Sequence, residues 1–332
     1  MTEDVTVLIA NLGNLENLLP CLRSLSQAAG KASFKVIVGF NFQGESGSPI
    51  ALASQFPEVE QLRAPTKLGY CRAYNQMMAR SKGRYVLLLD DDTTLRPGAM
   101  EIMVRFLDAH REIGIAGCRI VNPDGSYQKS TGLMCDLTVE AINVFRPGAI
   151  WRDGIDETVT DWKIVDWPSS TFLMVRAEVL QQVGMLDEFF YTSVLEADWC
   201  LRIKNAGWKA AYLPQAEITH LGGPHSVQPG VKTYGNLIRN HINRYYFFRK
   251  HYGAAAMHAL RPIMSAGALL RLVNYAAIWL INPDRRPEAG PKVAAYLKVM
   301  LLGIAARPDS LPDALRRENE AFGARLRPGI PG

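Results

Sequence analysis

The stretch Tyr85-Val-Leu-Leu-Leu-Asp-Asp-Asp92 joins an apolar run to three consecutive aspartates. A continuous run of valine and leucine predicts a strand that is buried on both faces, as in a parallel sheet. Open sheets of this kind bind ligands at the carboxyl ends of their strands. Three adjacent carboxylates repel one another, so the cluster points to a divalent cation shared with a diphosphate. The simpler alternative is that Asp92 and Thr93 only cap the next helix, although a cap needs one such residue.

Strand-like and helix-like patterns alternate along the first 120 residues. We expect strands at 5–12, 34–40, 59–62, 84–89 and 113–120, with helices near 15–25, 49–56, 70–81 and 99–110. Alternation of this kind is typical of βαβ units. It predicts a Rossmann-like α/β fold, with a mostly parallel central sheet and helices on both faces.

The pattern is less regular after residue 120. Residues 130–165 are expected to be irregular, and long loops inside a compact domain commonly border binding sites. The elements expected after them are strands at 171–175, 209–213 and 217–220, and helices at 177–183 and 197–206. From residue 231 onward the pattern is helical, which predicts a C-terminal helical extension.

The composition is that of an ordinary globular protein, with 48% apolar and 21% charged residues among 332. Its five cysteines are scattered and form no CxxC pair (Cys21, Cys71, Cys118, Cys135 and Cys200). This usage predicts reduced thiols in a cytoplasmic protein, without a disulfide framework or a zinc site. The acidic start of the chain does not have the pattern of a signal peptide, which agrees with that expectation.

Charge is distributed unevenly along the chain. Residues 1–230 carry 21 Lys or Arg against 26 Asp or Glu, whereas residues 231–332 carry 16 against 6. We therefore expect a catalytic domain over 1–230 and a basic helical region over 231–332. The basic region predicts contact with an anionic surface. Nucleic acid is not expected as the partner, because no recognition motif accompanies the charge.

The basic region contains two apolar segments, 263–281 and 292–307. The first approaches the length of a membrane span, but Arg271 and Asn274 in its middle would be costly at the centre of a bilayer. Basic amphipathic helices that lie in the membrane interface are the preferred interpretation. The alternative is that these helices pack on the catalytic domain or on another subunit of a homo-oligomer.

Four motifs follow one another along the chain. They are the aspartate run, Trp167-Pro-Ser-Ser-Thr-Phe172, Glu196-Ala-Asp-Trp-Cys-Leu-Arg202, and His220 before two glycines. As an ordered set over about 5–225, they resemble the family 2 glycosyltransferases, which have the GT-A fold. The resemblance implies a nucleotide-sugar half over about 1–120 and an acceptor half over about 121–230. Tyr245–Gly253 is similar to the rhamnosyltransferase-like branch, whereas the aspartates and Glu-Ala-Asp-Trp are similar to galactofuranosyltransferases.

The resemblance implies transfer of a sugar, with inversion, from a nucleotide diphosphate sugar to a hydroxyl group. The expected donor is dTDP-rhamnose or a UDP-galactofuranose type, and the expected acceptor is a glycan or a lipid-linked glycan. This chemistry belongs to bacterial surface polysaccharide synthesis, so we expect a cytoplasmic protein that is peripheral on the inner face of the cell membrane. Two alternatives remain open, an inactive binding or scaffold protein and a nucleotidyltransferase.

A leaving diphosphate needs a divalent ion, expected to be Mn²⁺ or Mg²⁺. The resemblance places its ligands at Asp90, Asp92 and His220. Strand alternation puts the side chains of Asp90 and Asp92 on the same side, and that of Asp91 on the other, toward the nucleotide or sugar. The alternative for His220 is a buried histidine with only a structural role.

An acceptor hydroxyl is a weak nucleophile and needs a base to take its proton. The resemblance places that base at Glu196. Asp198 is expected either to orient the acceptor or to pair with Arg202, which lies four residues further along the helix. The simpler alternative is that both acids only stabilise the N-terminus of a helix.

The remaining expected donor-site residues come from five segments. They are Ala10, Asn11, Gly13, Asn41, Lys67, Gly69, Arg72, Asp90, Asp91, Trp167, Ser169 and Ser170. Lys67 or Arg72 is expected at the diphosphate, and the Trp167 ring at the sugar. Asn11 and Asn41 depart from the family pattern, and Asn41 replaces the usual acid that reads the base or ribose.

Overall fold

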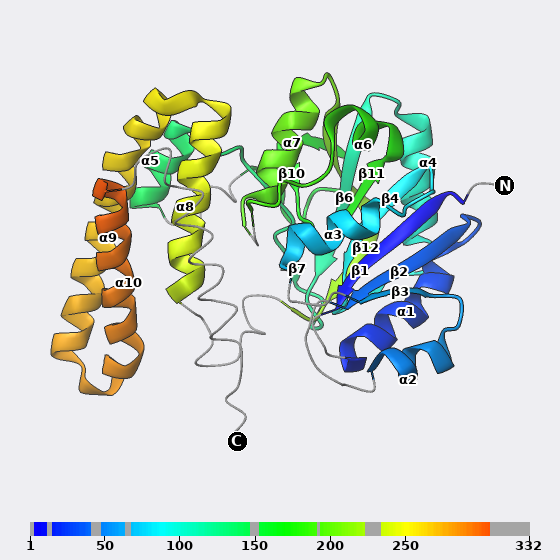
Figure 1. The fold of residues 1–332 in the computed structure, drawn as a ribbon, viewed down its shortest axis with the longest axis horizontal. Helices are drawn as coiled ribbons and strands as arrows, with labels where there is room; N and C mark the ends of the chain where they lie inside the picture. Colours follow the sequence, from blue (N-terminus) through cyan, green and yellow to red (C-terminus); the bar gives the residue numbers. More distant parts are fainter. Residues whose placement is uncertain are drawn as a thin grey trace. The chain divides into compact units, whose positions relative to one another are not determined.

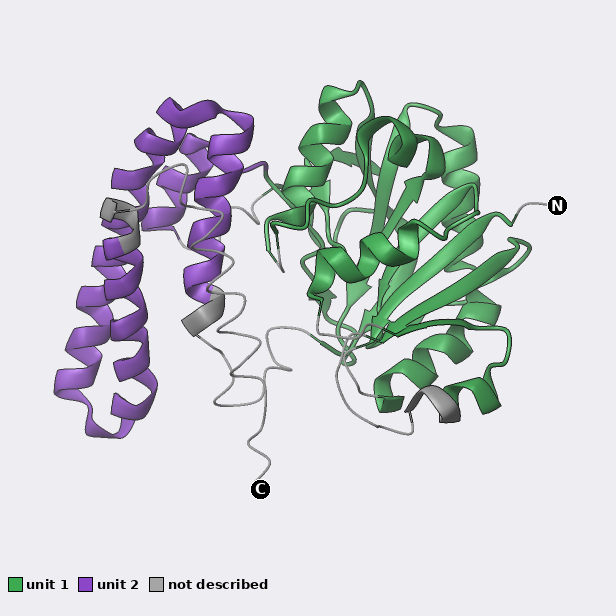
Figure 2. Cartoon of the chain, in the orientation of Figure 1, with its two compact units in different colours: residues 1–133, 151–227 green, residues 134–150, 228–332 purple. Residues whose placement is uncertain are grey.

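The computed structural model describes residues 3–11, 15–40, 48–63, 68–146, 153–190, 193–222 and 234–305. The chain divides into two compact units, which Figure 2 distinguishes by colour. Unit 1 comprises residues 1–133 and 151–227. Unit 2 comprises residues 134–150 and 228–332.

Unit 1 is an α/β domain built on one large sheet (Figure 1). Its strands are β1 (Val5–Asn11), β2 (Phe34–Phe40), β3 (Glu60–Arg63), β4 (Tyr85–Asp90), β5 (Thr93–Leu95), β6 (Ile113–Val121), β7 (Tyr127–Gln128), β8 (Thr131–Gly132), β9 (Lys163–Val165), β10 (Trp167–Pro168), β11 (Phe172–Arg176) and β12 (Lys209–His220). Its helices are α1 (Leu15–Ala29), α2 (Ser48–Gln55), α3 (Tyr70–Met78), α4 (Ala99–Ala109), α6 (Ala177–Val183) and α7 (Leu195–Asn205).

The order of strands across the main sheet is β3-β2-β1-β4-β11-β6-β12-β5. Strands β3, β2, β1 and β4 are parallel neighbours, and β6 and β12 are also parallel. Strand β11 lies between β4 and β6 and is antiparallel to both. The sheet is therefore mostly parallel, as expected, and β11 brings its N-terminal end beside the carboxyl end of β4.

Helices cover both faces of the sheet. One face packs against α1, α2 and α4, and these elements form a continuous apolar core with alternate residues of β1, β2 and β4. Helix α3 packs on the other face, where the Met77 side chain lies over Gly39. Valine and leucine of β4 are buried on both sides, with Val86, Leu87 and Leu88 all fully buried. This two-sided burial explains why the strand has an unbroken apolar sequence.

Two differences from the sequence-based expectation concern the longer elements. The segments 209–213 and 217–220 form one strand, β12, whose pairing with β6 shifts register between Leu213 and Glu217. Such an irregularity interrupts the alternation of side chains, which is why one strand reads as two. The segment 130–165 contains a helix, α5 (Leu137–Phe145), that was expected to be irregular.

Unit 2 is helical. It contains α5, α8 (Tyr234–His251), α9 (Gly253–Ile281), the short 3₁₀ helix η2 (Pro283–Arg285) and α10 (Arg286–Ala305). Helix α9 packs against α5, α8 and α10, and Tyr275 of α9 stacks on Tyr296 of α10 with ring centroids 5.9 Å apart. Within the described part of the chain, α9 is the one helix that is long and apolar enough to cross a membrane.

Candidate functional site

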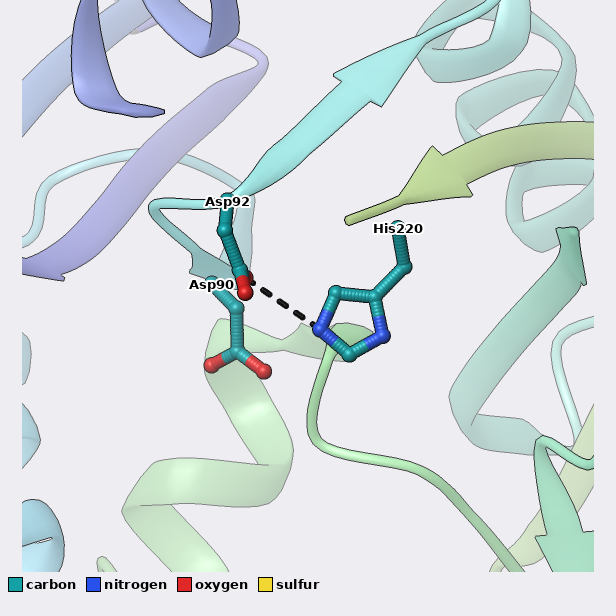
Figure 3. Close-up of side chains that lie close together, drawn as sticks. All are labelled: Asp90, Asp92 and His220. Atoms are coloured by element: carbon teal, nitrogen blue, oxygen red, sulfur yellow. Dashed lines mark ion pairs between the residues drawn. The ribbon is translucent and has the colours of Figure 1, made fainter. Parts of the chain in front are cut away.

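A cluster of two carboxylates and one imidazole lies at the carboxyl edge of the sheet (Figure 3). Asp90 is the last residue of β4, Asp92 lies in the turn that follows, and His220 ends β12. Each offers a ligand atom, and these atoms all lie within 4.8 Å of one another. Among the described residues this is the group of His, Cys, Asp and Glu side chains that is arranged to hold a metal ion.

Pairing between two strands brings His220 to the aspartates. The turn after β4 leads into β5, and β5 pairs with β12 so that Thr93 lies opposite His220. The Asp92 carbonyl accepts a 2.9 Å hydrogen bond from the Leu221 amide, and the His220 Nε2 atom lies 3.2 Å from Asp92 Oδ1. A Cβ atom at Gly222 would overlap the carboxylate of Asp92, so the close approach here requires glycine.

The charges of the cluster act on one another. Burial, and then the negative charge of Asp92, raises the pKa of Asp90 to about 7. Burial works to lower the pKa of His220, but the hydrogen bond and the charge of Asp92 outweigh it and raise this pKa above its usual range. The site without a cation therefore holds carboxylates that resist being ionised together.

These donors suit a divalent cation. Carboxylate oxygens suit Mg²⁺ and Mn²⁺, and imidazole is tolerated by Mn²⁺. The raised pKa of Asp90 is the expected mark of a carboxylate that lacks a compensating positive charge. Asp90, Asp92 and His220 thus fit the three positions that the sequence suggested as metal ligands.

Two consecutive residues, Ser170 and Thr171, link Glu196 to this cluster. The Asp90 amide donates to the Thr171 carbonyl at 3.1 Å, and the Ser170 hydroxyl donates to Glu196 Oε1 at 2.6 Å. Burial raises the pKa of Glu196 above its ordinary value of 4.5, and the Ser170 hydrogen bond offsets part of this effect. A carboxylate with a raised pKa is suited to take a proton near neutral pH.

Asp198 is turned in a different direction. Its carboxylate is buried and accepts a 3.0 Å hydrogen bond from Arg202 Nε, which is one of the two arrangements expected for it. The Arg202 guanidinium also donates to the carbonyls of Val183 and Met185. Asp198 therefore ties helix α7 to the segment after α6.

Helix α7 begins at an unusual backbone conformation. Val194, the residue before the helix, has φ of 68° and is the non-glycine residue with positive φ among those described. A β-branched residue is strained in this conformation. Glu196 follows two residues later, in the first turn of α7.

The expected donor-site residues have different surroundings. Ala10 pairs with Asp90 across β1 and β4, and Asn11 donates a 2.6 Å hydrogen bond to Asp91 Oδ2. Gly69 has φ of 82° at the start of α3. The Arg72 guanidinium is half-exposed and pairs with Glu188 at 2.9 Å.

The segment before β11 is more tightly packed. Trp167 is only 6% exposed, and its indole nitrogen donates to the Leu133 carbonyl at 2.8 Å. Its ring lies over Gly132, so a sugar would meet at most an edge of it. The Ser169 amide donates to the Ser130 carbonyl, while Ser170 reaches Glu196. Three other expected residues lie outside the described part of the chain: Gly13, Asn41 and Lys67.

Two residues at this site were absent from the sequence-based expectation. Gln128 Oε1 lies 2.9 Å from His220 Nδ1, and Thr171 contacts Asp90. Gln128 is 92 residues away from His220 and belongs to no motif. Thr171 lies inside the Trp167–Phe172 motif, directly after Ser170, so the sequence could have predicted that it lies at the site.

Several known proteins that this chain resembles are glycosyltransferases. Residues 3–241 match the family model described as "Glycosyltransferase like family 2". The N-acetylglucosaminyl-diphospho-decaprenol L-rhamnosyltransferase of Mycobacterium tuberculosis is 26% identical over 288 residues, covering 82% of this chain and 92% of that protein. The dTDP-rhamnosyl transferase RfbF of Shigella flexneri is 26% identical over 165 residues, covering 49% of this chain and 51% of that protein.

Solved structures show the same fold. A mannosyltransferase from Pyrobaculum calidifontis, solved with GDP-Man and Mn²⁺, has a TM-score of 0.53 at 14% sequence identity. The match covers 92% of this chain and 88% of that protein. At this level of identity, the likeness concerns the fold.

The fold and these similarities define the class of protein, a glycosyltransferase of GT-A fold with a C-terminal helical region. Within that class the chain belongs to glycosyltransferase family 2, since the family match spans more than half of its length. The resemblance drawn from the four motifs is thus confirmed. The rhamnosyltransferase relatives favour sugar transfer over the nucleotidyltransferase alternative.

Proposed function

We propose that this protein is an inverting, metal-dependent glycosyltransferase. It moves a sugar from a nucleotide diphosphate to a hydroxyl group of a glycan or a lipid-linked acceptor. The observation that carries the proposal is the convergence of Asp90, Asp92 and His220 within 4.8 Å, together with the Glu196 carboxylate that is linked to them through Ser170 and Thr171. A departing diphosphate needs a positive charge near its oxygens, and a hydroxyl nucleophile needs a base to take its proton.

The metal site serves the leaving group. Asp90, Asp92 and His220 would hold a Mn²⁺ or Mg²⁺ ion, which would supply positive charge for the departing diphosphate. Asp91 is directed away from these ligands by its hydrogen bond with Asn11. Both residues of that pair are placed to meet the nucleotide or the sugar of the donor.

Glu196 is the general base in this proposal. The acceptor oxygen forms a bond to the anomeric carbon, the bond from that carbon to the diphosphate oxygen breaks, and the acceptor proton passes to Glu196. Attack from the side opposite the leaving group inverts the configuration of the carbon. Burial makes the Glu196 carboxylate more basic, and the 2.6 Å hydrogen bond from Ser170 holds it in position.

The relatives guide the choice of substrates. Two of them are named for rhamnosyl transfer, one from dTDP and one to a decaprenol diphosphate-linked acceptor. We therefore place dTDP-rhamnose ahead of a UDP-galactofuranose-type donor, and a lipid-linked glycan as the acceptor in surface polysaccharide synthesis. Such an acceptor resides in a membrane, which suits a peripheral enzyme on the inner face of the cell membrane.

Incubation of the purified protein with a panel of nucleotide sugars tests the proposal. Each reaction contains Mn²⁺ or Mg²⁺ and a synthetic lipid-diphosphate N-acetylglucosamine, and the measurement is the release of nucleoside diphosphate. We expect release from dTDP-rhamnose, its abolition by EDTA, and an inverted anomer in the product by NMR. A folded protein that binds a nucleotide sugar but transfers none of the panel would instead support the inactive scaffold.

A further inference from the structure

Unit 2 exposes far more apolar surface than unit 1. Among the described residues, fourteen large apolar side chains are exposed, and eleven of them belong to unit 2. The eleven are Ile142, Phe145, Tyr252, Leu269, Leu270, Val273, Trp279, Leu280, Ile281, Leu297 and Leu301. Exposed apolar side chains in this number indicate a surface that meets a partner or a membrane.

Helix α9 is apolar on two faces. One stripe is buried against the rest of unit 2 (Met257, Leu260, Met264 and Ala268). A second stripe, here called the apolar ridge, is exposed and consists of Leu269, Leu270, Val273, Leu280 and Ile281. Val273 is 61% exposed and Ile281 is 81% exposed, and only 17% of the apolar window of this helix is buried. A helix that packs on a soluble core normally has a polar outer face, so the ridge is suited to an apolar medium.

Positive charges border the exposed apolar residues. Arg146 follows Phe145, Arg285 and Arg286 follow Ile281, and all three arginines are exposed. The described helices over 234–305 contain ten Lys or Arg residues against two acids. One of those acids, Glu288, is paired with Lys292 at 2.6 Å and with Arg285 at 3.4 Å.

We propose that the apolar ridge and the arginines beside it dock unit 2 on an anionic lipid bilayer. The ridge enters the acyl region at a shallow depth, and the arginines contact lipid phosphates. Trp279 lies near the end of the ridge with Arg286 5.3 Å above its ring centroid, a pairing suited to the headgroup level. This inference stands on unit 2 and uses no step of the sugar transfer.

Two other occupants of the ridge fit less well. A second copy of the chain would bring two strongly basic surfaces together, whereas anionic lipids neutralise them. A membrane-spanning role for α9 is disfavoured by Arg271, whose guanidinium is committed to the carbonyls of Gly267 and Asn143. The other face of α9 is packed along α5 and α10, so the helix is suited to lie flat in the interface.

Flotation of the purified full-length protein with lipid vesicles tests this proposal. We expect binding to vesicles that contain phosphatidylglycerol, weaker binding to pure phosphatidylcholine, and loss of binding at high salt. Replacing Leu280→Ser and Ile281→Ser together should lower the bound fraction about tenfold or more, and R285Q with R286Q should remove the preference for anionic lipid. The matched control is Ile164→Ser, an exposed apolar residue of unit 1, which should bind as wild type does.

The oligomeric state provides the opposing outcome. Each variant is checked by circular dichroism and by light scattering after size exclusion. The proposal is overturned if folded wild type does not float with anionic vesicles. It is also overturned if the wild type is a dimer, the Leu280→Ser, Ile281→Ser variant is a monomer, and vesicle binding is unchanged. The ridge would then be a subunit interface.

A separate observation concerns Gln128, and this second inference rests on the proposed metal site. Gln128 Nε2 donates a 3.2 Å hydrogen bond to the Gly222 carbonyl, which fixes the orientation of the amide. Its Oε1 atom is thereby turned to His220 Nδ1 at 2.9 Å. An amide oxygen only accepts hydrogen bonds, so Nδ1 carries a proton, and in the neutral imidazole that binds a metal the lone pair lies on Nε2.

We infer that Gln128 is a positioning residue for the metal ligand His220. The Nε2 atom faces Asp92, so the tautomer that Gln128 selects directs a lone pair at the place where a cation meets the carboxylates. Partners of this kind fix the ring and the tautomer of metal-binding histidines. Gln128 acts through His220 and does not itself contact the ion.

A double-mutant cycle on Mn²⁺ affinity, measured by electron paramagnetic resonance, tests this role. Gln128→Met removes the acceptor at similar size and should weaken Mn²⁺ binding about 10–100-fold. Gln128→Glu retains an acceptor toward Nδ1 and should restore most of the affinity. In a His220→Ala background, Gln128→Met should cause no further loss, because its effect passes through the imidazole.

The outcomes separate this inference from the proposed function. Equal loss from Gln128→Met with and without His220 would show a general effect on folding and overturn the positioning role. Unchanged Mn²⁺ affinity in Gln128→Met would overturn it as well, with the metal site intact. Absence of Mn²⁺ binding to the wild-type protein would instead overturn the metal site on which the inference rests.

Discussion

Two pairs of acids in this protein have the same spacing in sequence but different arrangements in space. Asp90 ends β4 and Asp92 lies in the turn after it, and with His220 they converge on one point. Glu196 and Asp198 stand in the first turn of a helix, and their carboxylates have separate partners.

The local backbone explains the difference. The turn after β4 leaves Asp92 beside Asp90 and His220, whereas residues two apart on a helix lie about 200° apart around the axis. The first pair is therefore suited to share one ligand. The second pair is divided, with Glu196 at the site and Asp198 in the packing of α7. The spacing of two acids in the sequence predicts whether they share a ligand only when the local secondary structure is known.

Removing one member of the converging pair should have the largest effect on activity. Asp92→Ala deletes a proposed metal ligand, so we expect transfer to fall on the order of 10³-fold or more. Mn²⁺ titration measures the loss of metal affinity, and steady-state kinetics measures the loss of transfer. Glu178→Ala removes an exposed acid of the same unit and should retain both properties. Full activity of Asp92→Ala in EDTA would exclude a metal role.

The next prediction concerns the member of the diverging pair that faces the site. Glu196→Gln removes the proposed base at nearly constant shape, so kcat should fall about 10²–10⁴-fold. The affinity for the donor, measured by calorimetry, should be unchanged because the metal cluster remains intact. Wild-type kcat in this variant would place the base elsewhere.

Asp198→Asn should act on stability, in contrast to its neighbour. The substitution leaves the partly buried Arg202 without its carboxylate, and we expect the free energy of unfolding to fall by about 3 kcal/mol. Urea unfolding measures this change, and transfer per folded molecule should remain near that of wild type. A stable but inactive Asp198→Asn protein would assign Asp198 to the acceptor.

The last expected effect is a pH dependence of the stability of the metal-free protein. The folded chain retains the Asp90 proton up to about pH 7, while the unfolded chain loses it near its ordinary pKa of 3.8. The folded state then binds more protons between these values, so the contribution of Asp90 to stability declines as pH rises through that range. Asp90→Asn should flatten this decline in thermal unfolding curves taken in EDTA. An identical pH profile for variant and wild type would contradict the raised pKa.

Much of the fold of unit 1 was predictable, because local patterns carry it. The strand Phe34–Phe40 and the helix Ala177–Val183 have the bounds that their periodicity indicated. Helix α5 was missed although Asp136 caps it by accepting a hydrogen bond from the Val139 amide. Helix α9, which packs against α5, lies more than a hundred residues away along the chain. The sequence near α5 therefore does not show what its apolar side chains pack against.

The site was predictable in part. The sequence suggested Asp90, Asp92 and His220 because a motif places each at or just after the end of a strand, and the structure brings their ligand atoms within 4.8 Å of one another. Gln128 was not found, since its contact with His220 depends on how β7 and β12 come to the same edge. The sequence likewise did not predict the hydrogen bond from the Trp167 indole to the Leu133 carbonyl, because it shows only an aromatic residue before Pro168.

By itself, the sequence determined the alternation of strands and helices, the acidic end of β4, and the basic character of the C-terminal region. These follow from side-chain chemistry and from spacing along the chain. The tertiary structure alone decided which acids converge, which histidine nitrogen faces them, and which apolar residues of α9 remain exposed. Those features depend on contacts between residues far apart in sequence, where strand register and helix packing set the distances.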